Sequence, residues 1–315
     1  MKIAILDADT LGSDLDLSIF SKFGTILQYP TTDSRSVVKH AKNCEILIVN
    51  KVRLSEEILA QLPDLQLICV AATGYDPIDI SYCRTHGIAV ANVPSYSTQS
   101  VAQWTFSVVL ALAMHLNAYC RYVKSGTYSG SAVANHLSPC YHELAGQTWG
   151  VIGYGGIGQQ VAKVASAMGC QVLVHKRTPI SDVKCVDLMT LCKMSDIITI
   201  HVPLTESTRG MIGQSQLAAM KKTVILVNAA RGLVLEEAAV AQSILDGKIG
   251  AFGCDVYSQE PFPVNHPYTR ILPFPNVLLT PHMAWGAYEA RRRCIQVISE
   301  NIQAFFAGTI CNRIV

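Results

Sequence analysis

The chain has 315 residues; half of them are hydrophobic, 15% are charged, and 25 basic against 23 acidic residues leave a formal charge of +2. This length predicts two domains, each able to bury a core without help from metals or disulfides. The near balance of charge argues against nucleic acid or an acidic membrane surface as a partner.

The N-terminal sequence and the spacing of the cysteines further restrict the class of protein and its compartment. The first residues, MKIAILDAD, enter a strand at once and lack the pattern of a signal peptide. The longest apolar stretch, residues 106–114, is too short to span a bilayer and is expected to form a buried or interface helix. Eleven cysteines are scattered with no C-x-x-C pair and no Cys/His cluster at metal-ligand spacing. We therefore expect a cytoplasmic protein without a bound metal, whose reduced cysteines act as small buried hydrophobes.

Short apolar runs alternate with helical patterns through the first third, which is typical of parallel α/β architecture. Strands are predicted at residues 2–6, 25–29, 45–49, 65–70 and 88–92. Ser55, followed by two glutamates, is predicted to cap a helix in one of the gaps. No glycine fingerprint follows any of these strands. We expect a doubly wound, flavodoxin-like substrate (lid) domain, formed by residues 1–97 together with 287–315.

A second α/β series follows a long helix predicted at about 98–119 and a Gly/Ser-rich passage at 125–132. Its strands are predicted at residues 149–152, 171–175, 196–202, 223–228, 250–256 and 276–280. A last helix, from about 288 to 306, has no further strand to pair with and is expected to return to the first domain. Its basic cluster, Arg291 to Arg293, is interpreted as a solvated face. Residues 98–286 are therefore predicted to form a second doubly wound parallel-sheet domain of the Rossmann type.

The stretch TWGVIGYGGIG at residues 148–158 marks the dinucleotide site of this second domain. An apolar strand leads into Gly153, Gly155 and Gly158 and then into a helical pattern, which is the context that makes G-x-G-x-x-G informative. The first glycine allows the sharp turn, the second lets the backbone approach a pyrophosphate, and the third lets helix and strand pack closely. The helix N-terminus favours phosphate. The alternative is a bare glycine turn between a buried strand and a helix.

Three polar residues lie just beyond the ends of later strands: Arg231, Glu260 and His282. Ligands of open α/β sheets bind outside the carboxyl ends of the strands, so these side chains are expected at the edge that carries the glycine turn. A guanidinium that forks onto a carboxylate, an imidazole and a carboxylate that tunes it suit redox chemistry at a carbonyl carbon. Taken singly, each is better explained without a functional role: Arg231 as a surface arginine, Glu260 as a turn residue and His282 as a core histidine.

The contexts of these residues, NAARG (228–232), DVYSQEP (255–261) and TPHMAW (280–285), closely resemble the three signatures of the D-isomer-specific 2-hydroxyacid dehydrogenases. VAATGYDPID (70–79), NVPSYSTQSVAQ (92–103) and IHVPLTESTRGMI (200–212) extend the resemblance over nearly the whole chain, in the family's order and spacing. Within the family the sequence is most similar to hydroxypyruvate/glyoxylate reductases (glycerate dehydrogenases) of bacterial type.

The resemblance implies a role for each matching residue. Arg231 would hold the substrate's carboxylate and carbonyl oxygen, His282 would exchange a proton with substrate, and Glu260 would fix the imidazole tautomer and favour its charged form. The amides around Thr73 and Gly74 would receive the carboxylate. The remaining residues implied at the cofactor are Thr98, Gly153, Gly155, Gly156, Ile157, Gly158, Val202, Pro203, Thr208, Ala229, Ala230, Asp255 (on the nicotinamide carboxamide) and His282.

The choice between NAD and NADP is indicated by the end of the second strand of the Rossmann domain. NAD-specific sites usually place Asp or Glu there, on the ribose 2′-hydroxyl. Here Lys176 stands at about that position, followed by Arg177 and Thr178. Such a loop can bind a 2′-phosphate through charge-assisted hydrogen bonds. We therefore favour NADP(H) over NAD(H), the alternative being a solvated loop with cofactor choice set elsewhere.

The predicted function is reversible reduction of a small 2-oxo acid, with hydroxypyruvate or glyoxylate favoured, to the D-2-hydroxy acid. Lys51 would reach the substrate from the first domain and Trp285 would wall its pocket; a plain surface lysine and a core tryptophan are the alternatives. The family's usual homodimer, with the 98–119 helix at the interface, is implied by resemblance. Competing interpretations are a D-lactate-type dehydrogenase, a non-catalytic dinucleotide sensor like the family's corepressors, or a formate dehydrogenase, although the last demands longer insertions.

Overall fold

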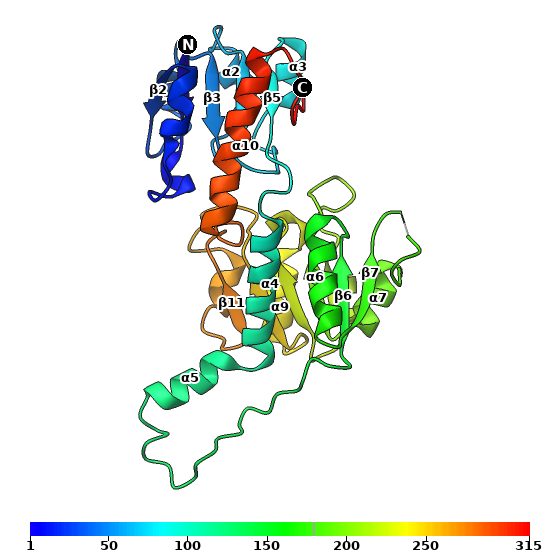
Figure 1. Cartoon of the computed structure of the whole chain (residues 1–315). Helices are drawn as coiled ribbons and strands as arrows, with labels where there is room; N and C mark the ends of the chain where they lie inside the picture. Colours follow the sequence, from blue (N-terminus) through cyan, green and yellow to red (C-terminus); the bar gives the residue numbers. More distant parts are fainter. Residues whose placement is uncertain (179) are drawn as a thin grey trace. The chain divides into compact units, whose positions relative to one another are not determined.

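Two units, each built around one parallel sheet, make up the chain (Figure 1). The computed structural model describes residues 1–178 and 180–315. The first unit comprises Met1–Ser97 and Gly286–Val315, and the second comprises Thr98–Trp285. Both sheets are entirely parallel among the strands of these ranges, so the predicted α/β class is confirmed.

The first unit has a five-stranded sheet in the order β2-β1-β3-β4-β5, the flavodoxin-like arrangement. All five predicted strands are present: β1 (Lys2–Ile5), β2 (Thr25–Gln28), β3 (Ile46–Val49), β4 (Leu67–Val70) and β5 (Ala89–Ala91). Every residue of β3, β4 and β5 is buried, as expected where helices cover a parallel sheet. Its helices are η1 (Ala8–Leu11), η2 (Leu17–Phe23), α1 (Val37–Ala41), α2 (Glu56–Leu59), α3 (Ile80–Thr85) and α10 (Tyr288–Phe306).

The last helix, α10, packs against β4 and η2 of the first unit, as the sequence predicts (Figure 1). The interpretation of its arginines as a solvated face is wrong for Arg291, whose guanidinium forks onto both carboxylate oxygens of Asp14 at 2.5 and 2.8 Å. Arg293 donates to the carbonyl oxygen of Tyr96 at 2.9 Å. Ser55 occupies the N-cap position of α2, as predicted, but its hydroxyl donates to the Glu57 carboxylate and accepts no hydrogen bond from a helix amide.

The second unit has a six-stranded sheet in the order β11-β10-β9-β8-β6-β7. A parallel bridge between Val174 and Cys185 adds a rudimentary strand beside β7. Counted along the chain from β6, the order becomes third, second, first, fourth, fifth, sixth, followed by one further strand at the edge, which contains the Rossmann arrangement. The strands are β6 (Thr148–Ile152), β7 (Gln171–His175), β8 (Ile197–Ile200), β9 (Ile225–Asn228), β10 (Ala251–Cys254) and β11 (Val277–Leu279).

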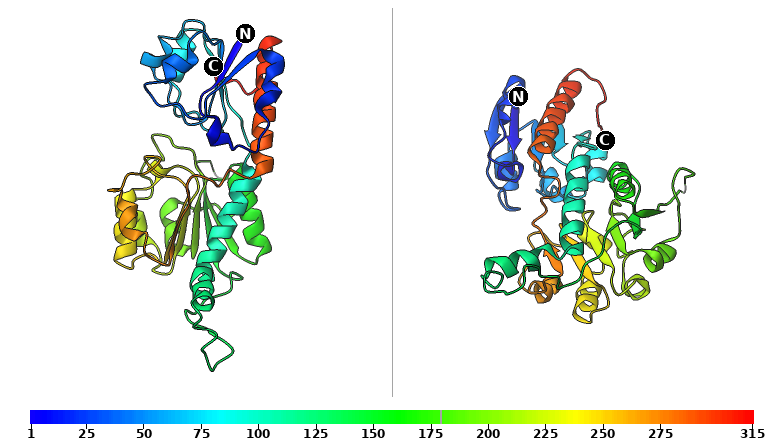
Figure 2. Two further views of the ribbon diagram at one scale, coloured as in Figure 1. Left: turned by 90° about the vertical axis from the view of Figure 1, so that its left-hand side faces the viewer. Right: turned by 60° about the horizontal axis from the view of Figure 1, so that its bottom comes forward.

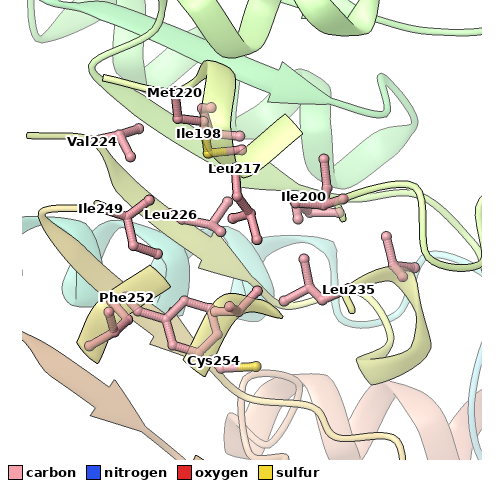
Figure 3. Close-up of a cluster of buried hydrophobic side chains, with 14 of the residues drawn as sticks. Ile198, Ile200, Leu217, Met220, Val224, Leu226, Leu235, Ile249, Phe252 and Cys254 are labelled. Atoms are coloured by element: carbon pink, nitrogen blue, oxygen red, sulfur yellow. The ribbon is translucent and has the colours of Figure 1, made fainter. Parts of the chain in front are cut away.

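Helices cover both faces of this second sheet. The helices α4 (Thr98–Ala113) and α6 (Gly156–Ala167) share one hydrophobic core with one face. The other face packs on α7 (Leu188–Met194), α8 (Gln214–Ala219) and α9 (Glu237–Leu245), through the cluster that contains Leu226, Phe252 and Leu217 (Figure 3). The short helices η3 (Gly232–Val234) and η4 (Pro267–Ile271) lie in loops that follow β9 and β10.

The single helix predicted at 98–119 is two helices. Residue His115 adopts a left-handed conformation with φ +50°, and α4 and α5 (Leu116–Lys124) meet at 63°. Figures 1 and 2 show α5 and the following segment extending from the body of the second unit. In the described ranges no single helix is long and apolar enough to cross a membrane, although this bent pair passes by length and composition. Two cysteines of this extension, Cys120 and Cys140, are exposed, which corrects the expectation that every cysteine is buried.

Candidate active site

The glycine turn joins β6 to α6 at the point where the strand order of the second sheet reverses. Gly153 has φ +92°, which only glycine adopts readily, and a Cβ there would lie 2.6 Å from the carbonyl oxygen of His201. Around Gly155 no atom lies within 4 Å of where a Cβ would be, so its backbone is approachable. A Cβ on Gly158 would overlap the carbonyl oxygen of Gly153. The glycine turn thus combines a bend that requires glycine, an open approach and a tight helix–strand contact, which fits a pyrophosphate at the α6 N-terminus.

Two alanine substitutions should separate these glycine roles. Gly158→Ala is expected to lower the free energy of unfolding by about 1–3 kcal/mol or more, because backbone must move to admit the methyl group. Gly155→Ala meets open space at φ −80° and should leave the fold intact while weakening dinucleotide binding. Urea unfolding and cofactor titration of both variants check this. Equal stability of the two variants would contradict the packing role of Gly158.

Other residues implied at the cofactor lie at the start of α4 and in the segments that follow β7 and β8. Thr98 begins α4, and its hydroxyl lies 3.4 Å from where a Cβ on Gly156 would be. Lys176 follows β7 and is half-buried, whereas Arg177 and Thr178 are exposed. The Thr208 hydroxyl donates to the carbonyl oxygen of Pro203 at 2.7 Å, so it holds the turn after β8.

His201, which the sequence analysis did not single out, stands at the end of β8 beside Val202. Both of its ring nitrogens are buried without a hydrogen-bond partner among the described residues. Burial lowers the pKa of the imidazole to about 3, so the ring stays neutral at physiological pH. This neutral ring adds no positive charge to the segment that runs beside the glycine turn.

Arg231 is presented by the loop that follows β9. Asn228, the last residue of the strand, is fully buried and spans the loop: its side chain accepts from the Ala230 amide and donates to the Arg231 carbonyl, both at 3.0 Å. The guanidinium donates to the carbonyl oxygen of Ala230 at 2.8 Å. Ala229, half-buried, contributes to the core beside α4. The loop thus holds Arg231 three residues beyond the strand end.

Glu260 and His282 come together although 22 residues separate them in the sequence. The carboxylate Oε2 lies 2.6 Å from the imidazole Nδ1, while Oε1 accepts from the Tyr257 amide at 3.0 Å. Both side chains keep access to solvent, with 29% and 23% exposed. His282 has φ +53°, a left-handed conformation that is uncommon outside glycine and that accumulates at functional sites.

The Asp255 carboxylate is hydrogen-bonded to the segment that carries His282. It accepts from the Thr280 hydroxyl at 2.5 Å and from the amides of Met283 and Ala284, both at 2.8 Å. Burial raises the pKa of this carboxyl, and the three hydrogen bonds oppose the shift. The family resemblance implies Asp255 on the nicotinamide carboxamide. In the structure the bonds of its carboxylate go to the His282 segment, whose unusual φ they help to maintain.

The implied substrate residues of the first unit lie in two loops at the carboxyl ends of its strands. Lys51 follows β3, and its amide donates to the buried carboxylate of Asp7 at 2.5 Å. Thr73 follows β4 and donates its hydroxyl to the Val93 carbonyl oxygen at 2.8 Å, next to Gly74. In the second unit, Trp285 is partly buried against the core that α4 and α6 share. Each of these side chains is thus placed by its own unit.

The motifs in the sequence do not indicate two buried residues that lie beside the loops of Arg231 and Glu260. Glu237 and His266 are 8% and 5% exposed and bond each other at 2.9 Å. Glu237 is the first residue of α9, six positions beyond Arg231, where a glutamate is ordinary in a first helical turn. No signal in the sequence separates it from its exposed neighbour Glu236.

A Rossmann sheet with a glycine turn at its switch point and a paired imidazole and carboxylate at the same edge defines a dinucleotide-dependent oxidoreductase. Residues 106–284 match the family model described as D-isomer specific 2-hydroxyacid dehydrogenase, NAD binding domain. The chain belongs to this family. It is therefore an oxidoreductase that uses a nicotinamide dinucleotide.

Individual relatives agree with this assignment. The chain is 37% identical over 308 residues to a glycerate dehydrogenase of Methylorubrum extorquens, covering 98% of this chain and 96% of that one. It is 32% identical over 321 residues to a hydroxypyruvate reductase of Blautia hydrogenotrophica, covering 99% of each. Among solved structures, a D-lactate dehydrogenase from Aquifex aeolicus complexed with NAD and lactic acid aligns with a TM-score of 0.86 at 30% identity, over 98% of this chain and 96% of that chain.

Proposed function

We propose that this protein reduces hydroxypyruvate or glyoxylate to the D-2-hydroxy acid and catalyses the reverse reaction. The observation that carries the proposal is the 2.6 Å contact between Glu260 and His282, at the sheet edge that also holds the glycine turn. The relatives named glycerate dehydrogenase and hydroxypyruvate reductase, which match this chain over nearly its full length, support the choice of substrate. The lactate-bound neighbour keeps a D-lactate-type activity as the alternative.

Arg231 is the substrate-binding residue assigned in the second unit, and Lys51, Thr73 and Gly74 are those assigned in the first. The guanidinium forks onto the substrate's carboxylate and carbonyl oxygen, where its planar geometry matches two oxygens at once. The amides around Thr73 and Gly74 receive the carboxylate, and Lys51 adds positive charge. Trp285 limits the length of the acid, which favours two- and three-carbon substrates.

Proton transfer is assigned to His282. Glu260 accepts a hydrogen bond from Nδ1, which fixes the tautomer and orientation of the ring, so Nε2 is the nitrogen that acts on substrate. In reduction, Nε2–H donates its proton to the carbonyl oxygen; in oxidation, Nε2 accepts the hydroxyl proton. A bound nicotinamide dinucleotide supplies or receives the hydride at C2. Arg231 meanwhile stabilises the negative charge that develops on the oxygen.

Residues for the dinucleotide follow from the fit of the glycine turn. Gly155, Gly156, Ile157 and Gly158 would hold the pyrophosphate at the α6 N-terminus, with Thr98 beside them. The nicotinamide would be lined by the segments after β8 and β9, which carry Val202, Pro203, Thr208, Ala229 and Ala230, with Asp255 and His282 at its carboxamide side.

NADP(H) is the proposed cofactor in preference to NAD(H), and Lys176 is the residue on which this choice depends most. Lys176→Asp should lower the ratio of kcat/KM with NADPH to that with NADH by about 10- to 150-fold, because one charge-assisted bond of about 1.5–3 kcal/mol to the 2′-phosphate is lost. Lys193→Asp is the matched control. Lys193 is exposed in the last turn of α7, just before β8 begins, and so lies near the amino ends of the strands, away from the carboxyl ends where the dinucleotide would bind. An unchanged ratio in Lys176→Asp would move cofactor choice elsewhere.

We also propose a homodimer in the cytoplasm. Large apolar side chains are exposed from the end of α4 through α5 and the following segment, an arrangement typical of association surfaces: Met114, Leu116, Val123, Tyr128, Val133, Leu137 and Tyr141. The interface assigned to the 98–119 helix is thus better placed on α5, because α4 packs mostly on its own sheet. The eleven cysteines, all free thiols, fit a reducing compartment.

The decisive experiment follows loss of reduced-nicotinamide absorbance with NADPH and NADH in parallel. The substrates are hydroxypyruvate, glyoxylate, pyruvate and a bulkier 2-oxo acid. Turnover of the first two with kcat/KM well above that of the others supports the proposal. Dominant turnover of pyruvate favours the lactate-type alternative, and cofactor binding without any turnover favours a sensor.

A further inference from the structure

The segment that carries Glu260 is hydrogen-bonded to the buried carboxylate of Glu237. Glu237, at the start of α9, directs both carboxylate oxygens to Ser258: Oε1 accepts from the amide at 2.8 Å and Oε2 from the hydroxyl at 2.5 Å. Oε2 also bonds His266 Nε2 at 2.9 Å. The Glu237 carboxylate thus accepts three hydrogen bonds, as a buried acidic group requires. We call Glu237 together with His266 the support of the Glu260 segment.

His266 has a defined tautomer in this arrangement. Its Nδ1 accepts from the Tyr268 amide at 3.2 Å, so in the neutral ring the proton resides on Nε2 and is donated to Glu237. The side chains of His266 and Glu237 are 4% and 7% exposed. The imidazole thus connects the Glu237 carboxylate to η4, whose N-cap is His266.

The support reaches the catalytic pair through one short segment, residues 257–260. Ser258 is bonded to Glu237, and the adjacent Tyr257 amide donates to Glu260 Oε1 at 3.0 Å. Tyr257 also donates its hydroxyl to the Thr280 carbonyl oxygen at 2.8 Å, two residues before His282. On the other side, Gly232 touches the Tyr257–Ser258 peptide so closely that a Cβ would overlap it. The loops of Arg231, Glu260 and His282 therefore all meet the segment that Glu237 fixes.

We propose that Glu237 is a positioning residue for catalysis, which fixes the 257–260 segment so that the Glu260 carboxylate stays on His282 Nδ1. This inference rests on the proposed function, in which that pair transfers the proton. Glu237 itself does not touch substrate or cofactor. Its loss should therefore reduce the rate of the chemical step more than the binding of either.

Glu237→Gln, in the full-length protein, tests this through the split between kcat and binding. We expect kcat with hydroxypyruvate to fall about tenfold or more, while the Kd of the cofactor changes less than about twofold. Glu236→Gln is the matched control, because the neighbouring Glu236 is exposed and carries the same charge. Unchanged kcat in Glu237→Gln, or an equal loss of cofactor affinity, would overturn the proposal.

A double substitution asks whether Glu237 acts through Glu260. In a Glu260→Gln background, adding Glu237→Gln should change kcat by less than about twofold, because residues that act through one another are not additive. Losses that multiply would show an independent effect and overturn the assignment. If Glu237→Gln does not fold, Ser258→Ala takes its place: it removes one donor and should lower kcat by roughly three- to tenfold with the same split.

An NMR measurement that needs no turnover tests the role of Glu237 independently of the proposed function. The proton between His282 Nδ1 and Glu260 gives a low-field NMR resonance in protein labelled with ¹⁵N-histidine. We expect this signal to move or broaden in Glu237→Gln and to stay in place in Glu236→Gln; an unmoved signal overturns the positioning role. Absence of turnover by the unmodified protein with every 2-oxo acid would instead refute the proposed function, and the NMR comparison would still decide the role of Glu237.

Discussion

His282→Asn is expected to lower kcat for 2-oxo acid reduction by about 10²- to 10⁴-fold, the usual contribution of a general acid. Asparagine removes the titratable ring but tolerates a left-handed backbone, and His282 has φ +53°. Alanine at the same position would add backbone strain to the loss of the proton donor. Steady-state kinetics with hydroxypyruvate and NADPH measure the effect.

Cofactor binding and the fold should survive this change, because Asp255 still holds the segment through backbone amides and the Thr280 hydroxyl. The control is His142→Ala, at an exposed histidine remote in sequence from the loops of Arg231, Glu260 and His282. If His282→Asn retains more than about a third of the unmodified kcat, His282 is not the proton donor, since loss of a general acid costs far more than that.

The second largest effect is expected for Arg231→Lys, which should reduce kcat/KM by about 100-fold or more. Lysine keeps the charge but loses the fork, and each charge-assisted hydrogen bond is worth about 1.5–3 kcal/mol. The guanidinium also bonds the Ala230 carbonyl oxygen at 2.8 Å while it would face the substrate, two directions that one ammonium on a flexible stem holds poorly.

Titration of hydroxypyruvate at saturating NADPH gives kcat/KM for Arg231→Lys, and thermal unfolding shows that the fold persists. Arg270→Lys is the control, because Arg270 is an exposed arginine of η4. Near-normal kinetics in Arg231→Lys would remove Arg231 from the mechanism.

Much of the fold could be predicted because strand and helix periods are local properties. Each of the eleven predicted strands is present in residues 1–178 and 180–315, and α10 spans Tyr288–Phe306 as expected. The break between α4 and α5 was missed because apolar periodicity continues through it. His115 carries no proline or glycine signal; its left-handed conformation depends on how the chain leaves the sheet.

Some residues of the candidate site could likewise be predicted from the sequence, and others could not. The glycine turn and the positions of Arg231, Glu260 and His282 follow from motifs beyond strand ends, because parallel strands bring their carboxyl ends to one edge. Glu237 and Glu236 are adjacent and chemically identical in the sequence, yet one is buried on Ser258 and the other exposed. Only the side-chain environment distinguishes them.

By itself, the sequence of this protein determined two parallel α/β units, a dinucleotide turn and a set of polar residues at strand ends, all of which depend on residue type and spacing. Tertiary structure alone decided which of these groups meet. The Glu260–His282 pair, the attachment of the His282 segment to Asp255 and the support from Glu237 and His266 join residues 22 to 29 positions apart. Such contacts depend on loop paths and burial, which no local pattern encodes.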